Sequence, residues 1–289
     1  MVVEQPLLAA SEEPNASRVL ARQRHEVILA EVRHRGSVRV TELATLLSVS
    51  DMTIRRDLDV LDDSGLIEKV HGGATACTDR SADEPGFAVK SLRNTNEKLA
   101  IAHAAASLVR PGTAIGVTGG TTTWQLAYHL TEIADLIVVT NSLRVAEVLH
   151  QSPRADRTVI LTGGVRTRSD ALVGPVSVQA LRSLHFDAVF MGVHGMSQRA
   201  GFTSPNLSEA ETNRAFVDAA QQLVVLADHT KWDVTGLSSF ASLRDAHTVV
   251  TDTNILDVAR LALDAQVGRL LLADPNEPEF AAQEMRRRA

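Results

Sequence analysis

Two adjacent arginines, Arg55 and Arg56, follow Ser50, Met52 and Thr53 within one short segment. A guanidinium group can donate two parallel hydrogen bonds to the edge of a guanine or to a phosphate. Arg55, Arg56, Met52 and Thr53 occupy the side of a predicted helix that its apolar residues leave free. The segment therefore predicts contact with double-stranded DNA. One of the arginines could instead pair with Asp57, and this alternative remains open.

Two short amphipathic helices must position these side chains. Apolar residues at helical spacing line one side of each helix; they are Leu43, Leu46 and Leu47 in the first and Ile54, Leu58 and Leu61 in the second. Ser50 can cap the second helix, and Asp51 suits its positive end. The pattern predicts a helix-turn-helix whose second helix enters the major groove with its N-terminal end.

A glycine pair follows the second helix at Gly72 and Gly73, directly after His71. Two glycines permit a tight turn and expose backbone N–H donors, which suits contact with DNA phosphates. The same pair also suits an ordinary hairpin. With this turn the N-terminal part becomes a winged helix-turn-helix.

Composition is ordinary for a globular protein. Hydrophobic residues make up 44% of the 289 residues, charged residues 22% and aromatic residues 3%. The single cysteine, Cys77, fits a reducing compartment, and no apolar run approaches the ~20 residues that span a bilayer. Residues 1–14 lack the basic start of a signal peptide. We expect a cytoplasmic location and no membrane partner.

The net charge of −6 is unusual for a protein that binds nucleic acid. Residues 18–75 hold nine basic and nine acidic side chains, so this region is neutral and the negative excess lies elsewhere. A weak overall field leaves much of the affinity for DNA to specific contacts and to dimerisation.

The order of the segments predicts two domains. We expect a disordered tail at 1–16, the winged helix-turn-helix at 17–75, a polar linker at 76–95, and an effector-binding and oligomerisation domain at 96–289. From residue 96 onward, short runs of branched apolar residues alternate with helical segments. That alternation predicts a mostly parallel α/β sheet with right-handed crossovers.

Three predicted strands end in polar or glycine-rich turns, where ligands of such sheets bind. The candidate residues in these turns are Gly120, Thr121, Thr122, Asn141, Gly163 and Gly164. Glycines let the backbone approach an anion, and hydroxyls and free N–H groups at a helix start can bind phosphate oxygens. Any one such turn could simply reverse the chain. Three on one sheet favour a ligand site.

The ordered series of motifs resembles the DeoR/GlpR family of bacterial sugar-metabolism repressors. The series begins with the segments 49–58 and 71–74 and continues with Gly120-Thr121-Thr122, Val138–Asn141, Thr162–Gly164, Phe190–Gly192, Glu209-Ala210 and Asp228–Lys231. The resemblance implies a C-terminal domain with a fold like those of sugar-phosphate isomerases and CoA transferases, which senses a phosphorylated sugar.

The resemblance also brings three further residues to the predicted effector site. It favours Lys231 as a cation beside the anion, although a lysine there could be a solvated surface residue. Glu209 could equally serve the dipole of its helix or face solvent, and His194 could be a packed histidine. Thr118 and Asn213 depart from the family pattern, which often has aspartate and lysine there.

These features predict a transcriptional repressor of a carbohydrate operon, a homodimer or homotetramer, released from its operator by a phosphorylated sugar. The alternative is a sugar-phosphate isomerase or acyl-CoA transferase-like enzyme fused to a DNA-binding module. Such chemistry needs a positioned base, and the segment 192–195 contains no acid. We therefore expect no catalytic residue. No His or Cys spacing suggests a metal, and no cofactor is expected.

Overall fold

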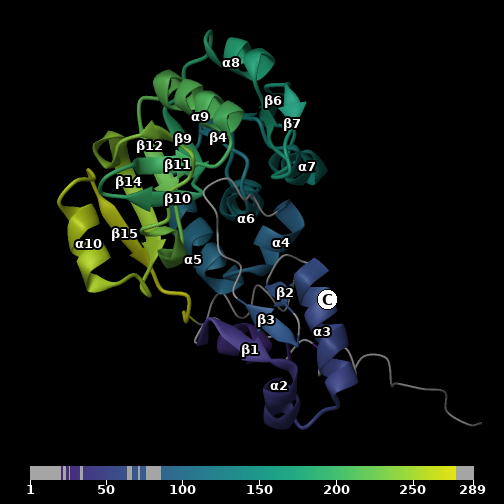
Figure 1. The fold of residues 1–289 in the computed structure, drawn as a ribbon. Coiled ribbons are helices and arrows are strands. Elements are labelled where there is room, and N and C mark those ends of the chain that lie inside the picture. Colours follow the sequence, from purple (N-terminus) through teal and green to yellow (C-terminus); the bar gives the residue numbers. More distant parts are fainter. Residues whose placement is uncertain are drawn as a thin grey trace, which may run out of the picture. The chain divides into compact units, whose positions relative to one another are not determined.

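A computed structural model describes residues 21, 24, 25, 27–32, 35–63, 67–70, 72–75 and 86–277. By its internal contacts the chain divides into two compact units, Met1–Thr78 and Asp79–Ala289 (Figure 1). The predicted tail at 1–16, most of the predicted linker and residues 278–289 lie outside the described residues.

The first unit has the elements of a winged helix. The described residues between 21 and 35 are helical, and they are followed by β1 (Ser37–Arg39), α2 (Val40–Leu47), α3 (Asp51–Asp63), β2 (Glu68–Val70) and β3 (Gly73–Thr75). The three strands form an antiparallel sheet in the order β1-β3-β2. Strand β1 therefore belongs to the sheet of the wing.

The core of the first unit follows the predicted apolar spacing with one correction. Leu43, Ile54, Leu58 and Leu61 are buried, but Leu46 is 53% exposed. The buried stripe of α2 runs through Val40, Leu43 and Ala44, at the spacing i, i+3, i+4. Leu46 falls on the opposite side of this eight-residue helix, so the sequence assigned it to the wrong face.

The second unit is built on a parallel sheet of seven strands in the order β15-β14-β12-β9-β4-β5-β6. This confirms the predicted mostly parallel α/β class. Its strands are β4 (Ala114–Val117), β5 (Ile137–Thr140), β6 (Thr158–Leu161), β9 (Ala188–Gly192), β12 (Leu223–Leu226), β14 (Ala246–Asp252) and β15 (Leu270–Ala273).

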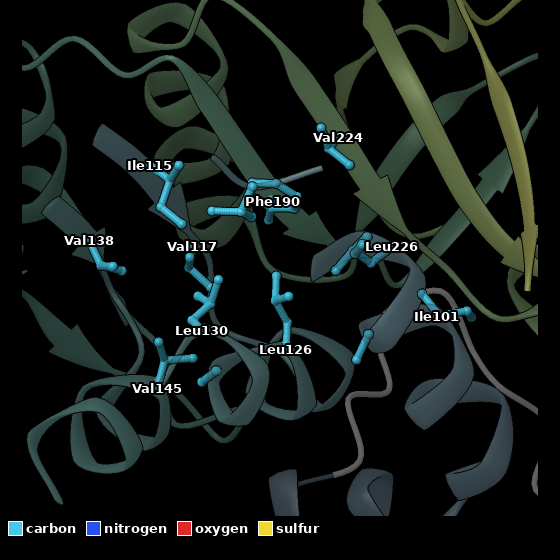
Figure 2. Close-up of a cluster of buried hydrophobic side chains, with 14 of the residues drawn as sticks. Ile101, Ile115, Val117, Leu126, Leu130, Val138, Val145, Phe190, Val224 and Leu226 are labelled. Atoms are coloured by element: carbon cyan, nitrogen blue, oxygen red, sulfur yellow. The ribbon is translucent and has the colours of Figure 1, made fainter. Parts of the chain in front are cut away.

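Helices cover both faces of this sheet. They are α5 (Thr95–Ala106), α6 (Thr121–Leu130), α7 (Leu143–Gln151), α8 (Pro175–Leu181), α9 (Leu207–Ala219) and α10 (Asp257–Asp264). On one face, α5, α6 and α7 bury an aliphatic layer in which Leu126 and Leu130 point toward Val117 and Phe190 (Figure 2). On the other face, residues of α8, α9 and α10 pack around Phe186 and Phe216.

Several smaller elements were not predicted. The segment 76–95, expected as a linker, contains the helix α4 (Phe87–Leu92), and Phe87 is buried. A hairpin of β7 (Val165–Arg166) and β8 (Leu172–Val173) follows β6. A second sheet joins β10 (Gly195–Ser197), β11 (Gly201–Ser204) and β13 (Ser238–Ala241). Strands of two to four residues carry too little periodicity to stand out in the sequence.

Candidate functional site

The N-terminal end of α3 carries the predicted DNA-contacting residues on its outer surface. Ser50 Oγ accepts a hydrogen bond from the Thr53 N–H at 3.2 Å and lies 3.0 Å from the Thr53 hydroxyl. Ser50 therefore caps the helix, as the sequence predicted. Met52 is 69% exposed, and Arg55 and Arg56 are exposed as well.

Asp57 does not hold either arginine. It is buried, and its carboxylate accepts hydrogen bonds from Arg24 at 2.8 and 3.0 Å and contacts His25 Nε2 at 3.0 Å. Asp57 thus joins α3 to the helical segment that contains Arg24 and His25. Neither arginine makes a side-chain hydrogen bond within the part of the chain that the structure describes. Both side chains are therefore available to a ligand.

The two wing glycines have different roles. Gly72 is exposed with φ +82°, and no atom lies within 4 Å of where a Cβ would stand. At Gly73 a Cβ would lie 2.0 Å from the carbonyl oxygen of Val38, so glycine lets β3 approach β1. Gly72 alone is free to approach DNA, and His71 lies outside the described residues.

In the second unit, the β4–α6 turn forms the centre of the candidate effector site. Gly120 is the N-cap of α6 and lies beside Gly192 at the end of β9. Thr121 and Thr122 begin the helix, and their hydroxyls make no hydrogen bond with any described residue. The buried Thr118 hydroxyl also has no partner there. Several polar groups at a helix N-terminus are thus available to an anion.

Asn141 supports this turn. Its side-chain oxygen accepts the Gly119 N–H at 2.8 Å, and its amide donates to the Leu172 carbonyl at 3.0 Å. The residue is only 2% exposed. This geometry fits a positioning role better than the direct ligand contact that the sequence suggested.

Gly163 and Gly164 serve the β7–β8 hairpin. Both have positive φ, and a Cβ on Gly164 would lie 2.5 Å from the carbonyl oxygen of Val173. They follow β6, which is four strands away from β12, the strand that leads to Lys231. Four strand spacings amount to about 19 Å. The single shared site that the sequence suggested for these turns and Lys231 stays a prediction.

A group of cations instead surrounds Asp228 at the end of β12. Lys98, at the start of α5, is 5% exposed and donates hydrogen bonds to the carbonyls of Lys90 and Arg93. The pKa of Lys98 is lowered to about 8, mainly by burial; Asp228 opposes this shift, and the charges of Lys231, Lys90 and Arg93 add to it. Positive charge is therefore concentrated beside the β12 end of the sheet.

Asp228 stays ionised within this group. Burial raises its pKa, but Lys231, the Thr230 hydroxyl and Lys98 outweigh burial, so the pKa lies below the usual value. Asn94 also donates to the carboxylate at 3.1 Å. One carboxylate among several cations leaves a net positive site that suits an anion.

The short helix η1 (His229–Lys231) fixes the position of Lys231. The carboxylate of the fully buried Asp252 accepts the His229 N–H at 2.8 Å and lies 2.8 Å from its Nδ1. The hydrogen bond to Asp252 raises the pKa of His229. These bonds anchor the turn that carries Lys231.

The two remaining candidate residues are Glu209, on α9, and His194, which follows β9. Glu209, in the first turn of α9, accepts hydrogen bonds from the hydroxyls of Thr167 at 3.0 Å and Ser204 at 3.1 Å. It therefore links the hairpin to β11. His194 is half-buried after β9, and its backbone N–H donates to the Thr203 carbonyl. Asn213 is half-buried on α9.

Sequence reasoning missed Lys98 and the α4–α5 turn. Lys98 lies four and seven residues before Ala102 and Ala105, which are both fully buried. This spacing places the lysine on the core-facing side of α5 and could have identified it as a buried cation. Lys90 and Arg93 carried no comparable signal.

The described part of the chain has neither a metal-binding cluster nor a helix that could span a membrane. Its His, Cys, Asp and Glu side chains form no group that could hold a metal ion. None of its helices has the length and apolar character needed to cross a bilayer.

Comparison with known proteins agrees with this architecture. Residues 24–80 match the model of the DeoR-like helix-turn-helix domain, and residues 93–253 match that of the DeoR C-terminal sensor domain. The HTH-type transcriptional regulator FruR of Bacillus subtilis (strain 168) is 35% identical over 239 residues, 82% of this chain and 94% of the relative. A lactose phosphotransferase system repressor of Staphylococcus epidermidis is 34% identical over 78% of this chain and 90% of its own.

Among solved structures, ribose 5-phosphate isomerase A of Methanocaldococcus jannaschii aligns with 48% of this chain and 55% of its own. The identity is 18% and the TM-score 0.36. The winged helix and the attached α/β sensor define a DNA-binding transcriptional regulator. The chain belongs to the DeoR family.

Proposed function

We propose that this protein represses a carbohydrate-metabolism operon and releases its operator when the second unit binds a phosphorylated sugar. The names of relatives, such as the lactose phosphotransferase system repressor, support a carbohydrate operon. The phosphate would lie between the N-terminus of α6 and the cations beside Asp228. Thr121 and Thr122 would bind it through hydroxyls and N–H groups, and Lys231 and Lys98 through charge.

The observation that carries this proposal is the buried Lys98 beside Lys231. Cations are rarely enclosed without a matching number of anions, since desolvating a charge costs free energy that only a partner recovers. The described side chains supply Asp228 as the near carboxylate. A bound phosphate dianion would balance the remaining charge. Gly120 and Gly192 would let the ligand approach the backbone, and Glu209 and His194 would contact the sugar hydroxyls.

We propose no catalytic activity. The carboxylates at this edge of the sheet are engaged by neighbouring donors: Asp228 by Thr230 and Asn94, and Glu209 by Thr167 and Ser204. A general base must reach the proton that it removes. The protein would act in the cytoplasm as a homo-oligomer, since paired half-sites on DNA match the symmetry of a dimer.

Calorimetry with the full-length protein tests the effector. A panel of sugar phosphates and the same sugars without phosphate would be titrated, and each binding compound would then be added to the protein on an operator selected from random duplexes. We expect one or more phosphorylated sugars to bind and to release the DNA. Binding of free sugars alone, or of nothing in the panel, would overturn the proposal.

A further inference from the structure

Helix α4 is the first described element after residues 76–85, which join the second unit to the DNA-binding unit. It is therefore the part of the second unit nearest in sequence to the winged helix. The helix has only six residues, and an isolated helix of that length is unstable in water.

A few contacts hold α4 in place. Phe87 packs edge-on against Trp124, with ring centroids 5.5 Å apart, and the Arg144 guanidinium lies over its other side at 5.4 Å. The Phe87 N–H donates to the Arg168 carbonyl at 3.0 Å, and Lys90 Nζ donates to the Ser169 hydroxyl. At the opposite end Leu92 is 70% exposed. The N-terminal end of α4 is thus packed, whereas its C-terminal end depends on polar contacts.

Lys98 supplies the polar contact at that end. Its ammonium group donates to the carbonyls of Lys90, in the last turn of α4, and of Arg93, the C-cap residue. A cation at a helix C-terminus satisfies orphan carbonyls and interacts favourably with the helix dipole. An ammonium group has three N–H donors, and these two bonds use two of them.

The same side chain belongs to the candidate anion site. Asp228 and Lys231 are close enough to Lys98 to act on its charge. One buried residue therefore connects the ligand site with the end of α4.

We propose that Lys98 couples effector binding to α4: an anion bound beside Lys231 takes the third N–H of Lys98, keeps the ammonium charged, and tightens its hold on the C-terminal carbonyls of α4. The inference rests on the proposed function and adds the route by which the ligand acts. The ordered helix then restricts the chain that leads to the DNA-binding unit. A ligand shifts an equilibrium only through differential contacts, and this third hydrogen bond is such a contact.

The size of the effect follows from the third hydrogen bond. Two N–H groups of Lys98 hold the carbonyls of Lys90 and Arg93, and a charge-assisted bond from the third N–H to the anion would fix the ammonium in that position. We expect amide exchange in α4 to slow by about fivefold, in line with the strength of one hydrogen bond.

Hydrogen exchange of the full-length protein tests the coupling. Exchange of the peptide that covers residues 86–94 would be followed with and without inorganic phosphate at saturating concentration, and then with each sugar phosphate that calorimetry shows to bind. Lys98→Met should speed exchange in α4 without ligand and abolish the response to it. Lys231→Met should weaken anion binding, so that a higher phosphate concentration is needed to slow exchange in α4.

Ser91→Ala is the matched control. The Ser91 hydroxyl donates to the Ala88 carbonyl within α4 and makes no bond with Lys98. This variant should change exchange without ligand but retain the fivefold response. An anion that binds without slowing exchange in α4 would overturn the coupling and leave the proposed function standing. An unchanged response in Lys98→Met would also overturn it. If no phosphate compound binds, the proposed function fails and the coupling fails with it.

Discussion

The two units hold their functional cations in opposite ways. In the winged helix, Arg55 and Arg56 are exposed and make no hydrogen bond with described residues, while the buried Asp57 is occupied by Arg24 and His25. In the sensor, Lys98 is buried and bonded to backbone carbonyls. An exposed cation can contact a large polyanion such as DNA. A buried cation can contact only an anion small enough to reach it. The comparison predicts that the exposed arginines favour a large polyanion and the buried lysine a small anion.

The largest effect is expected at the wing. Gly73→Ala would place a Cβ 2.0 Å from the Val38 carbonyl oxygen and should lower the free energy of unfolding of the first unit by about 3 kcal/mol. Gly72→Ala has open space but a positive φ, and should cost about 1 kcal/mol. Thermal unfolding of the two full-length variants measures the difference. Equal losses would show that the approach of β1 and β3 does not require Gly73.

The exposed arginines come next. Arg55→Ala and Arg56→Ala should each weaken operator binding by about 1–3 kcal/mol and relax sequence preference, because a bidentate contact to a base is lost. Gel shifts at fixed salt measure this. Arg154→Ala, which removes an exposed arginine paired with Asp156 in the sensor, is the control and should have no effect. Unchanged binding by both α3 variants would mean that this face does not read DNA.

Lys231→Ala should separate the two functions. We expect effector affinity to fall by about 10- to 100-fold, as for loss of one charged hydrogen bond, while operator affinity stays unchanged. Arg260→Ala, an exposed pair partner of Asp257 on α10, should leave both affinities intact. Loss of operator binding with an intact effector response would contradict the assignment of Lys231 to the sensor site.

The smallest effect is a pH dependence. Because the pKa of Lys98 lies at about 8, amid Asp228, Lys231, Lys90 and Arg93, its charge is present below that pH and lost above it. A phosphate ester is already a dianion throughout this range. Effector affinity should therefore fall about tenfold from about pH 7 to about pH 9. Calorimetry would follow it, and Lys98→Met should flatten the profile. A rise in wild-type affinity over this range would contradict the role of Lys98.

The sequence predicted much of this architecture because its signals are local. Ile54, Leu58 and Leu61 repeat at helical spacing, and the strands at 114–117 and 158–161 have the predicted bounds. The candidate sensor site depends on interactions between residues far apart in the sequence. Lys98 and Asp228 are 130 positions apart. The amide of Asn141 donates to Leu172, which belongs to a hairpin that was not predicted. Leu46 was misplaced because two turns of helix define a face poorly.

The packing of α4 also has an optical consequence. The chain contains two tryptophans. Trp124 packs edge-on against Phe87 of α4, and Trp232 directly follows Lys231. Indole emission responds to local polarity and quenching, so the unlabelled wild-type protein carries one reporter at each end of the proposed route from ligand to α4. Replacing either indole with phenylalanine leaves the other as a single reporter, and stopped-flow fluorescence can then tell which end moves first.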